Sequence, residues 1–315
     1  MSIRPPLSTR ALHAGYVALR APLLRAARRR TDAWIEQELA AFDIRALEPA
    51  RADAAFLILT FGNAGYLDFI GNWYRHFEPL GIPNYTVVAL DAEADERLRA
   101  GGLRSHLLTT TSLERPGTFA SYGQRDFNRL TAQKILFVYL LLHHGVDVLL
   151  TDADTIWVQD PRPALEHAAD LQIQVDNHGA FEVDAEVLTH PNVNTGFYYA
   201  RSNERTTRLF RNVLTLLELY PRFNDQNAMN LALKRGRKQI ALLEPGADVT
   251  DAERLSVRLL DPLLFPNGSV FFRESERYAA KGAEPIMVHA NWIHGRERKI
   301  ACLEERGWWD PTQLL

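Results

Sequence analysis

Residues 131–161 read TAQKILFVYLLLHHGVDVLLTDADTIWVQDP, and this stretch decides the fold. It lies within a long apolar pattern that predicts a helix over Gln124–His144, ended by Gly145. The following VDVLL, Val146–Leu150, predicts a buried strand that runs directly into Asp152. Because ligands of open α/β sheets bind beyond the carboxyl ends of the strands, this order predicts acidic side chains at a ligand-binding edge.

Short aliphatic runs and longer helical patterns alternate on both sides of this stretch. Strands are expected at Ala54–Phe61, Tyr85–Leu90, Arg104–Leu108 and Asn194–Ala200, and further helices at Glu204–Leu219 and from about Asp225. This alternation predicts an α/β fold: a Rossmann-like, mixed but mostly parallel sheet with helices on both faces. The less regular second half is expected to supply the antiparallel or mixed part.

The chain divides into two parts by pattern. Residues 1–50 predict a helical N-terminal extension, and residues 51–315 predict one domain, because no linker or internal repeat interrupts them. The extension carries an amphipathic pattern with many arginines between Arg10 and Arg30. Two fates are open for such a helix: packing on the domain or on a partner subunit of a homo-oligomer, or lying on an anionic membrane surface.

Composition excludes some classes of protein. The 315 residues are 46% hydrophobic and 24% charged, as in ordinary globular proteins, and the net charge of -3 gives no reason to expect a nucleic-acid partner. Cys302 is the single cysteine, so no internal disulfide can form. No apolar stretch is long enough to span a bilayer or to form a signal peptide, which predicts a cytoplasmic protein, with membrane contact confined to the periphery.

The acidic pair Asp152 and Asp154 is the first candidate for chemistry. In an extended segment residues i and i+2 point the same way, so both carboxylates can face one cation. Carboxylate oxygens suit Mg²⁺ and Mn²⁺. The plainer alternative is that the two acids only cap a turn before Ile156.

The segment 131–161 resembles the nucleotide-sugar transferases of the plant rhamnogalacturonan xylosyltransferase family and, more distantly, the glycogenin-like family. Both have the GT-A fold. The resemblance extends over about residues 55–309 and implies that the Asp-x-Asp motif binds a metal and the ribose of the donor. By the same resemblance Lys134 reaches the donor, Ala153 lies between the two motif acids, and Asp160-Pro161 ends the next strand.

Further matched positions follow from the resemblance. Thr60, Asn63 and Tyr66 fall in the loop expected to meet the nucleotide, where an aromatic ring can stack on uracil. The alternative for Tyr66 is a core aromatic at a helix start. NVNTGFYYAR and FNDQNAMNLAL imply that Asn194, Asp225 and Gln226 approach the donor sugar; an acid at the start of a helix also complements the helix dipole.

The C-terminal segment VHANWIHGRERK, Val288–Lys299, completes the resemblance. His289 matches the third metal ligand of the family, and imidazole tolerates Mn²⁺. Gly295 permits close approach of the backbone to phosphate, and Arg296 and Lys299 can donate charge-assisted hydrogen bonds to it.

The resemblance implies a metal-dependent transferase that uses Mn²⁺ or Mg²⁺ and retains the anomeric configuration of the sugar. The donor implied is a UDP-sugar, such as UDP-galactose or UDP-xylose, and the acceptor a glycan, glycolipid or protein. Asp225 would be the nucleophile of a covalent route, whereas Gln226 would support a front-side route, which we favour.

Other readings remain open at this point. A non-catalytic nucleotide-sugar-binding protein is the main alternative, and a metal-dependent phosphate-ester hydrolase is a third, although the sequence offers no second metal site. The acceptor surface is expected in the loop Thr109–Arg125 and in Asp176–Pro191. Within the second segment, Asp176, Asn177, His178 and Glu182 are the expected contacts. The ending Arg-Glu-Arg-Lys departs from the glycogenin-like pattern, which speaks against autoglycosylation.

Overall fold

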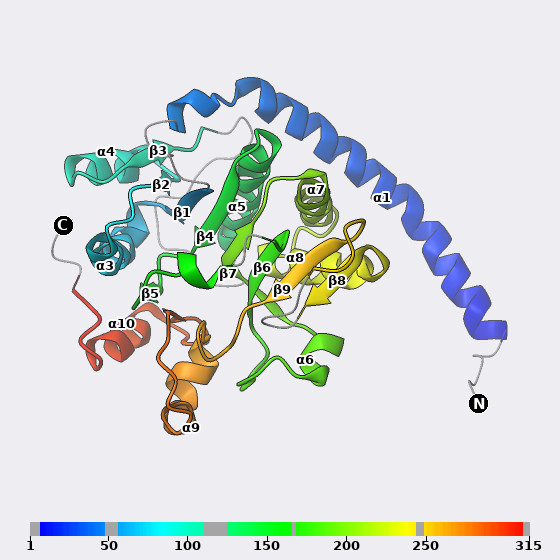
Figure 1. Cartoon of the computed structure of the whole chain (residues 1–315). Coiled ribbons are helices and arrows are strands. Elements are labelled where there is room, and N and C mark those ends of the chain that lie inside the picture. Colours follow the sequence, from blue (N-terminus) through cyan, green and yellow to red (C-terminus); the bar gives the residue numbers. More distant parts are fainter. Residues whose placement is uncertain (1–6, 48–55, 110–124, 166–167, 244–248, 311–315) are drawn as a thin grey trace.

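A computed structural model describes residues 7–47, 56–109, 125–165, 168–243 and 249–310. Its centre is an eight-stranded sheet with the order β3-β2-β1-β4-β7-β6-β9-β8. The strands are β1 (Phe56–Gly62), β2 (Tyr85–Ala89), β3 (Ser105–Leu107), β4 (Asp147–Thr151), β6 (Leu171–Val175), β7 (Val193–Ala200), β8 (Ile240–Leu243) and β9 (Leu255–Leu259). Figure 1 shows this sheet at the middle of the molecule.

Strand directions confirm the predicted mixed, mostly parallel sheet. Strands β3, β2, β1 and β4 are parallel, and so are β6, β9 and β8. Strand β7 pairs antiparallel with both β4 and β6, with Thr151 opposite Phe197. The expected antiparallel part of the second half is therefore the NTGFYYA strand.

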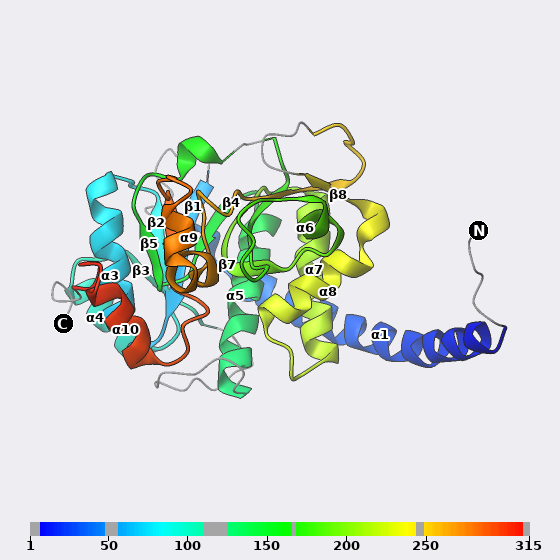
Figure 2. The same cartoon turned by 90° about the horizontal axis from the view of Figure 1, so that it is seen from below.

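Helices cover both faces of the sheet, as Figures 1 and 2 show. One face carries the apolar cluster formed with α5 (Arg125–His143), α7 (Glu204–Leu219) and α8 (Asp225–Arg235). The other face carries α3 (Leu67–Phe77), α4 (Ala92–Ala100) and α10 (Arg296–Glu304). Two short helices, α6 (Ala185–Thr189) and α9 (Ser275–Ala279), lie in the connections. The predicted α/β fold class is thus confirmed.

Local sequence explains the packing of these helices. Helix α7 begins with a capping box, in which Asn203 accepts from the backbone N–H of Thr206 and the Thr206 hydroxyl accepts from the backbone N–H of Asn203. Helix α3 buries Trp73 and Phe77 completely against the sheet. Burying such a side chain contributes about 1.5–3 kcal/mol, so these helices are fixed by packing rather than by propensity.

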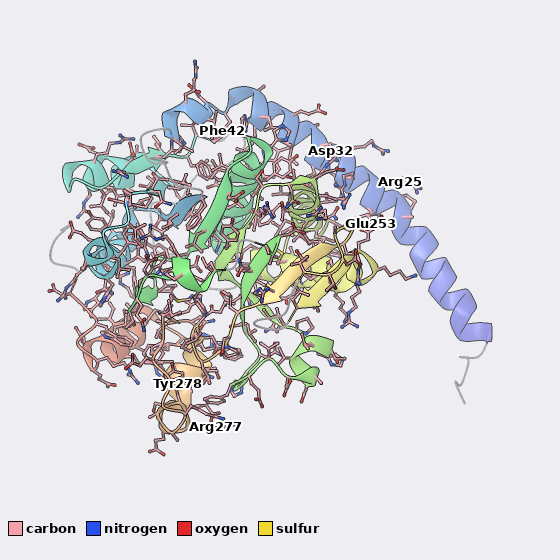
Figure 3. All side chains as sticks on the ribbon, in the orientation of Figure 1. Arg25, Asp32, Phe42, Glu253, Arg277 and Tyr278 are labelled. Carbon is pink, nitrogen blue, oxygen red and sulfur yellow. The ribbon has the colours of Figure 1, made fainter. Side chains whose placement is uncertain are left out.

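The N-terminal extension is one helix, α1 (Leu7–Ala41), followed by a short turn at Ile44–Leu47. Its C-terminal part packs along α7, where Asp32 pairs with Arg211 at 2.6 Å and Ile35 joins the core. Its N-terminal part projects beyond the rest of the molecule (Figures 1 and 2), and Arg25 points away from the body (Figure 3). Among the described helices, none is long and apolar enough to cross a bilayer.

Candidate metal and sugar-nucleotide site

The two motif acids lie in a tight turn directly after β4. The backbone N–H and the hydroxyl of Thr155 both donate to the Asp152 carbonyl, at 3.2 and 2.8 Å. The expected extended geometry is therefore wrong, because residues 152–154 form a turn between β4 and β5 (Thr155–Trp157). The turn nevertheless brings both carboxylates toward one point at the carboxyl end of the strand.

A two-stranded ribbon brings the third member of the cluster. Strand β10 (Met287–His289) pairs antiparallel with β5 and sets His289 opposite Thr155. The backbone N–H of Ala290 also donates to the Asp154 carbonyl at 3.0 Å. Strand pairing therefore explains how a histidine far along the chain reaches the two acids.

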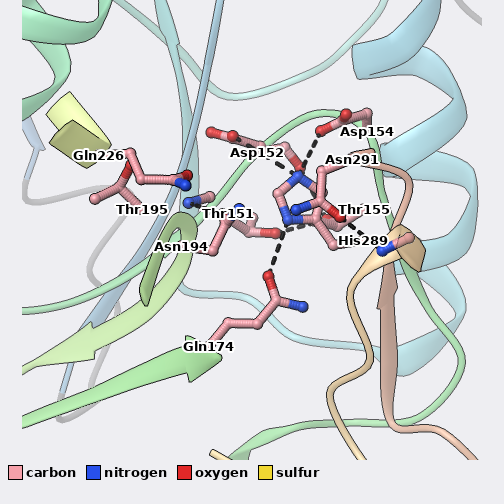
Figure 4. A network of polar contacts seen from close by, with 12 residues as sticks. Thr151, Asp152, Asp154, Thr155, Gln174, Asn194, Thr195, Gln226, His289 and Asn291 are labelled. Atoms are coloured by element: carbon pink, nitrogen blue, oxygen red, sulfur yellow. Dashed lines mark hydrogen bonds and ion pairs between the residues drawn. The ribbon is translucent and has the colours of Figure 1, made fainter. Parts of the chain in front are cut away.

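Asp152, Asp154 and His289 form a compact cluster of possible ligands (Figure 4). One ligand atom from each residue lies within 4.8 Å of the others. His289 Nε2 is 3.2 Å from Asp154 Oδ1 and 3.9 Å from Asp152 Oδ2. These separations let the three atoms surround one ion.

The donor set fits a divalent cation. His289 is 2% exposed, and its Nδ1 faces Gln174 Oε1 at 2.9 Å, which leaves Nε2 directed at the carboxylates. Two carboxylate oxygens and one imidazole nitrogen suit Mn²⁺, and the carboxylates also suit Mg²⁺. A partner on the second ring nitrogen is the usual way in which proteins orient a ligating histidine.

Gly196 on β7 makes room for the cluster. A Cβ atom at this position would overlap the His289 ring, the Asp152 carboxylate and the Asn194 side chain. The Gly196 carbonyl also accepts from the Asp152 N–H at 2.7 Å. The glycine of the NTGFYYA strand is therefore required by close approach to the site.

Lys134 on α5 lies behind the cluster and joins two of the predicted residues. Its ammonium is 3.0 Å from Asp152 Oδ1 and 2.9 Å from Asp225 Oδ2, and it donates to the Thr195 carbonyl at 3.3 Å. Burial alone would lower the pKa of Lys134, but the two carboxylates outweigh burial and raise it above its ordinary value. The lysine therefore carries a buried positive charge at neutral pH.

The C-terminal cations take different positions. Lys299 Nζ lies 2.5 Å from Asp154 Oδ2. Burial favours a higher pKa for Asp154, yet Lys299 and then His289 hold the pKa well below its usual range. Arg296 instead pairs with Asp68 and contacts the Gly65 carbonyl, whereas Gly295 takes a φ of 91° where α10 begins.

A buried carboxylate, Asp176, ties together the other side of the site. It accepts hydrogen bonds from Gln226 Nε2 at 2.9 Å and Asn194 Nδ2 at 3.2 Å. It also accepts from Asn291 Nδ2 at 2.8 Å and Trp292 Nε1 at 3.0 Å. Asp176 is 5% exposed, so it holds β7, α8 and the segment after β10 in place.

Three residues expected near the nucleotide lie at the end of β1. Thr60 is fully buried within the strand, and Asn63 is 1% exposed directly after it. The Tyr66 ring lies 6.5 Å from that of Phe69, and burial, followed by the charges of Asp154 and Asp152, raises the pKa of Tyr66 above its ordinary value. Ala153, between the two motif acids, is also buried.

The expected acceptor segments are only partly described. Residues 110–124 lie outside the described residues. Asn177 stays within its own loop, where it donates to the His190 carbonyl, and the His178 ring lies 5.2 Å from that of Trp292. Asp176, the first residue of the second segment, adjoins the site through its hydrogen bond from Gln226.

A hollow of about 570 Å³ lies elsewhere, between α6, α8 and β8. Its walls are aliphatic and basic, with contributions from Leu188, Leu231, Ile240, Arg237 and Arg254. None of the described residues that line it is a carboxylate, so these residues offer no ligand set like that of the cluster after β4. The cluster remains the better candidate for chemistry.

Sequence reasoning missed three supporting residues: Gln174, Gly196 and Asn291. Gly196 and Asn291 lie inside the quoted motifs, but their roles depend on contacts with residues that are distant in the sequence. Gln174 had a weak signal, because the buried strand LQIQV places glutamines among aliphatic residues. A buried polar side chain requires a partner, and here that partner is His289.

The strand-end acids, the histidine and the mixed sheet have the arrangement expected of the GT-A class of sugar-nucleotide transferases. The chain belongs to the nucleotide-diphospho-sugar transferase family, whose profile matches residues 80–303. The resemblance inferred from the motifs is thereby confirmed.

Three relatives illustrate the range of the family. Over 85% of the length of the present chain, it is 28% identical to the beta-arabinofuranosyltransferase RAY1 of Arabidopsis thaliana. It is 30% identical to the UDP-galactose:fucoside alpha-3-galactosyltransferase of Dictyostelium discoideum over 60% of its length. It is 27% identical to UDP-D-xylose:L-fucose alpha-1,3-D-xylosyltransferase 1 of Arabidopsis thaliana over 61%. The matches span 50%, 29% and 53% of these relatives, respectively.

Proposed function

We propose that this protein is a metal-dependent, retaining glycosyltransferase that moves a sugar from a UDP-sugar to the hydroxyl of a glycan, glycolipid or protein. The observation that carries the proposal is the cluster of Asp152, Asp154 and His289 at the end of β4, in a chain of the sugar-nucleotide transferase family. Two relatives carry UDP-galactose and UDP-D-xylose in their names, which supports these two donors.

Asp152, Asp154 and His289 would hold Mn²⁺ or Mg²⁺, which supplies positive charge against the diphosphate leaving group. Lys299, already within reach of Asp154, offers a second cation to the same phosphates. Lys134 balances the charge of Asp152 and Asp225 from the protein side. These residues therefore gather positive charge where the bond to the sugar breaks.

The contacts of Asp225 and Gln226 favour the front-side route. Asp225 is 3% exposed and its carboxylate is paired with Lys134 at 2.9 Å, which weakens it as a nucleophile. Gln226 Nε2 donates to Asp176 at 2.9 Å, so its amide is held in place as polar support rather than as a nucleophile. In this route the acceptor hydroxyl attacks from the side of the departing diphosphate, which takes the proton.

The test is a panel of UDP-sugars with Mn²⁺, first by thermal shift and then by release of UDP. Active transferases leak some donor to water, so UDP release from one donor, abolished by a chelator and restored by Mn²⁺, is the expected result. Binding without any UDP release would favour the alternative, a non-catalytic nucleotide-sugar-binding protein. Release that is unaffected by the chelator would refute the role of the metal.

Retention needs its own measurement. The anomeric proton of the transferred sugar, observed by NMR with an accepted acceptor, is expected to keep the α-configuration of the donor. A β-linked product would refute retention. Mass spectrometry of the trapped enzyme would reveal a glycosyl-Asp225 species if the covalent route operates, and we expect none.

A further inference from the structure

Gln174 is a fully buried side chain that touches the metal cluster without belonging to it. It lies on β6 with 0% exposure. Its Nε2 donates to the Phe265 carbonyl at 3.0 Å, and its Oε1 lies 2.9 Å from His289 Nδ1 (Figure 4). One amide therefore bridges a backbone carbonyl and the imidazole.

These two contacts fix the direction of every hydrogen bond along the bridge. A backbone carbonyl can only accept, so the NH₂ group of Gln174 must face Phe265 and its oxygen must face His289. An oxygen can only accept, so Nδ1 of His289 must carry a proton. In the neutral ring the lone pair then lies on Nε2, 3.2 Å from Asp154 Oδ1.

We propose that Gln174 is a positioning residue that fixes His289 in the Nδ1–H tautomer and thereby sets the preference of the site for Mn²⁺ over Mg²⁺. The inference rests on the proposed metal-dependent function. Mg²⁺ is a hard ion that favours oxygen ligands, whereas Mn²⁺ also accepts imidazole. Loss of a correctly presented Nε2 should therefore weaken Mn²⁺ binding more than Mg²⁺ binding.

The deciding experiment measures the dissociation constants of both ions by calorimetry for the wild type and for Gln174→Met. Methionine has a similar length but provides no strong acceptor for Nδ1. We expect the Mn²⁺ dissociation constant to rise roughly 10- to 100-fold, the usual effect of losing such a partner. The Mg²⁺ constant should change by less than about threefold, since it depends on the carboxylates. Equal changes for both ions, or no change, would overturn the proposal.

Two further variants separate positioning from general loosening. Gln172→Met makes the same change at a fully buried residue of the same strand, whose register partners are Tyr199 and Arg258. It should leave the ratio of the two constants unaltered. Gln174→Glu keeps an acceptor toward Nδ1; because the Phe265 carbonyl can only accept, the carboxyl oxygen that faces it must carry a proton, and in this form the variant should preserve the ratio. A Gln174→Glu protein with the same altered ratio as Gln174→Met would count against the proposal.

A measurement without metal tests the positioning role separately from the proposed function and from catalysis. In protein labelled with ¹⁵N-histidine, two-bond ¹H–¹⁵N correlations report the tautomer of each neutral ring. The His289 signal is the one missing from the spectrum of His289→Gln. At a pH where the ring is neutral, His289 should be Nδ1–H in the wild type and mixed in Gln174→Met. The same tautomer in both proteins would refute the positioning role. If the wild type bound neither ion, the metal-dependent function would fail while this spectrum still decided the tautomer.

Discussion

His289 Nε2 lies 3.2 Å from Asp154 Oδ1, although one residue ends β10 and the other lies in the turn after β4. The pairing of β10 with β5 produces this proximity, because His289 stands opposite Thr155 in that register. Acidic side chains alone would repel one another here. Lys299 Nζ, 2.5 Å from Asp154 Oδ2, offsets part of this repulsion.

Asp154→Ala should remove the activity but not the fold. The side chain of Asp154 belongs to the cluster, and a metal supplies several kcal/mol of charge stabilisation in a transition state, so turnover should fall at least about 100-fold. The check is UDP release with saturating Mn²⁺, together with the melting temperature. Asp160→Ala, which removes a partly exposed pair with Arg162 after β5, is the matched control and should retain turnover. If Asp154→Ala in metal-free buffer turned over as fast as the wild type with Mn²⁺, Asp154 would not be a metal ligand needed for turnover.

Much of this site could be predicted from the order of residues along the chain. The pattern VDVLLTDAD placed two acids at a strand end, because a buried strand followed by acids is a local property. His289 needed the family resemblance, since only the β5–β10 pairing makes it a neighbour. The partners of Arg296 and Gln174 could not be foreseen: Asp68 and His289 reach them through tertiary packing that no local pattern encodes.

Lys134→Met should destabilise the protein because it leaves two carboxylates without their shared cation. The side chain of Lys134 is 8% exposed, and breaking a buried pair by removing one partner typically costs about 3–5 kcal/mol. Urea unfolding measures the loss. The double variant Lys134→Met/Asp225→Asn should be less destabilised than the sum of the two single variants, because one of the two unpaired charges is gone. Lys234→Met, at an exposed position on α8, is the control and should have little effect on the free energy of unfolding. Strictly additive losses in the double variant would refute the coupling between Lys134 and Asp225.

The pair Asp170–Arg205 should make stability depend on pH in the acid range. Burial favours a higher pKa for Asp170, but hydrogen bonds from Arg205 and from the Ser256 backbone hold it below the ordinary 3.8. A lowered folded pKa means that the contribution is present above the unfolded value and is lost as the pH falls through the folded one.

Asp170→Asn should therefore lower the free energy of unfolding by about 2 kcal/mol at pH 7, the usual contribution of charged hydrogen bonds. This difference in unfolding free energy from the wild type, the gap, should narrow below pH 4. Urea unfolding between pH 2 and pH 7 measures this gap. Glu204→Gln, at a side chain that is 93% exposed, should track the wild type throughout. A gap that stays constant with pH would show that Asp170 contributes by packing alone.

Gly196→Ala should weaken metal binding by displacing ligands of the site, without removing any of them. The added Cβ would overlap the His289 ring and the Asp152 carboxylate, so both must move. Overpacking of this kind typically costs about 1–3 kcal/mol, and displaced ligands should weaken Mn²⁺ binding more than tenfold. Calorimetric Mn²⁺ titration and urea unfolding measure the two effects separately. Gly101→Ala adds the same methyl group at an exposed helix end, where φ is -77° and alanine is tolerated, and it should leave both quantities unchanged. If Gly196→Ala bound Mn²⁺ as tightly as the wild type, the ion would have to sit away from the face of the cluster that β7 closes.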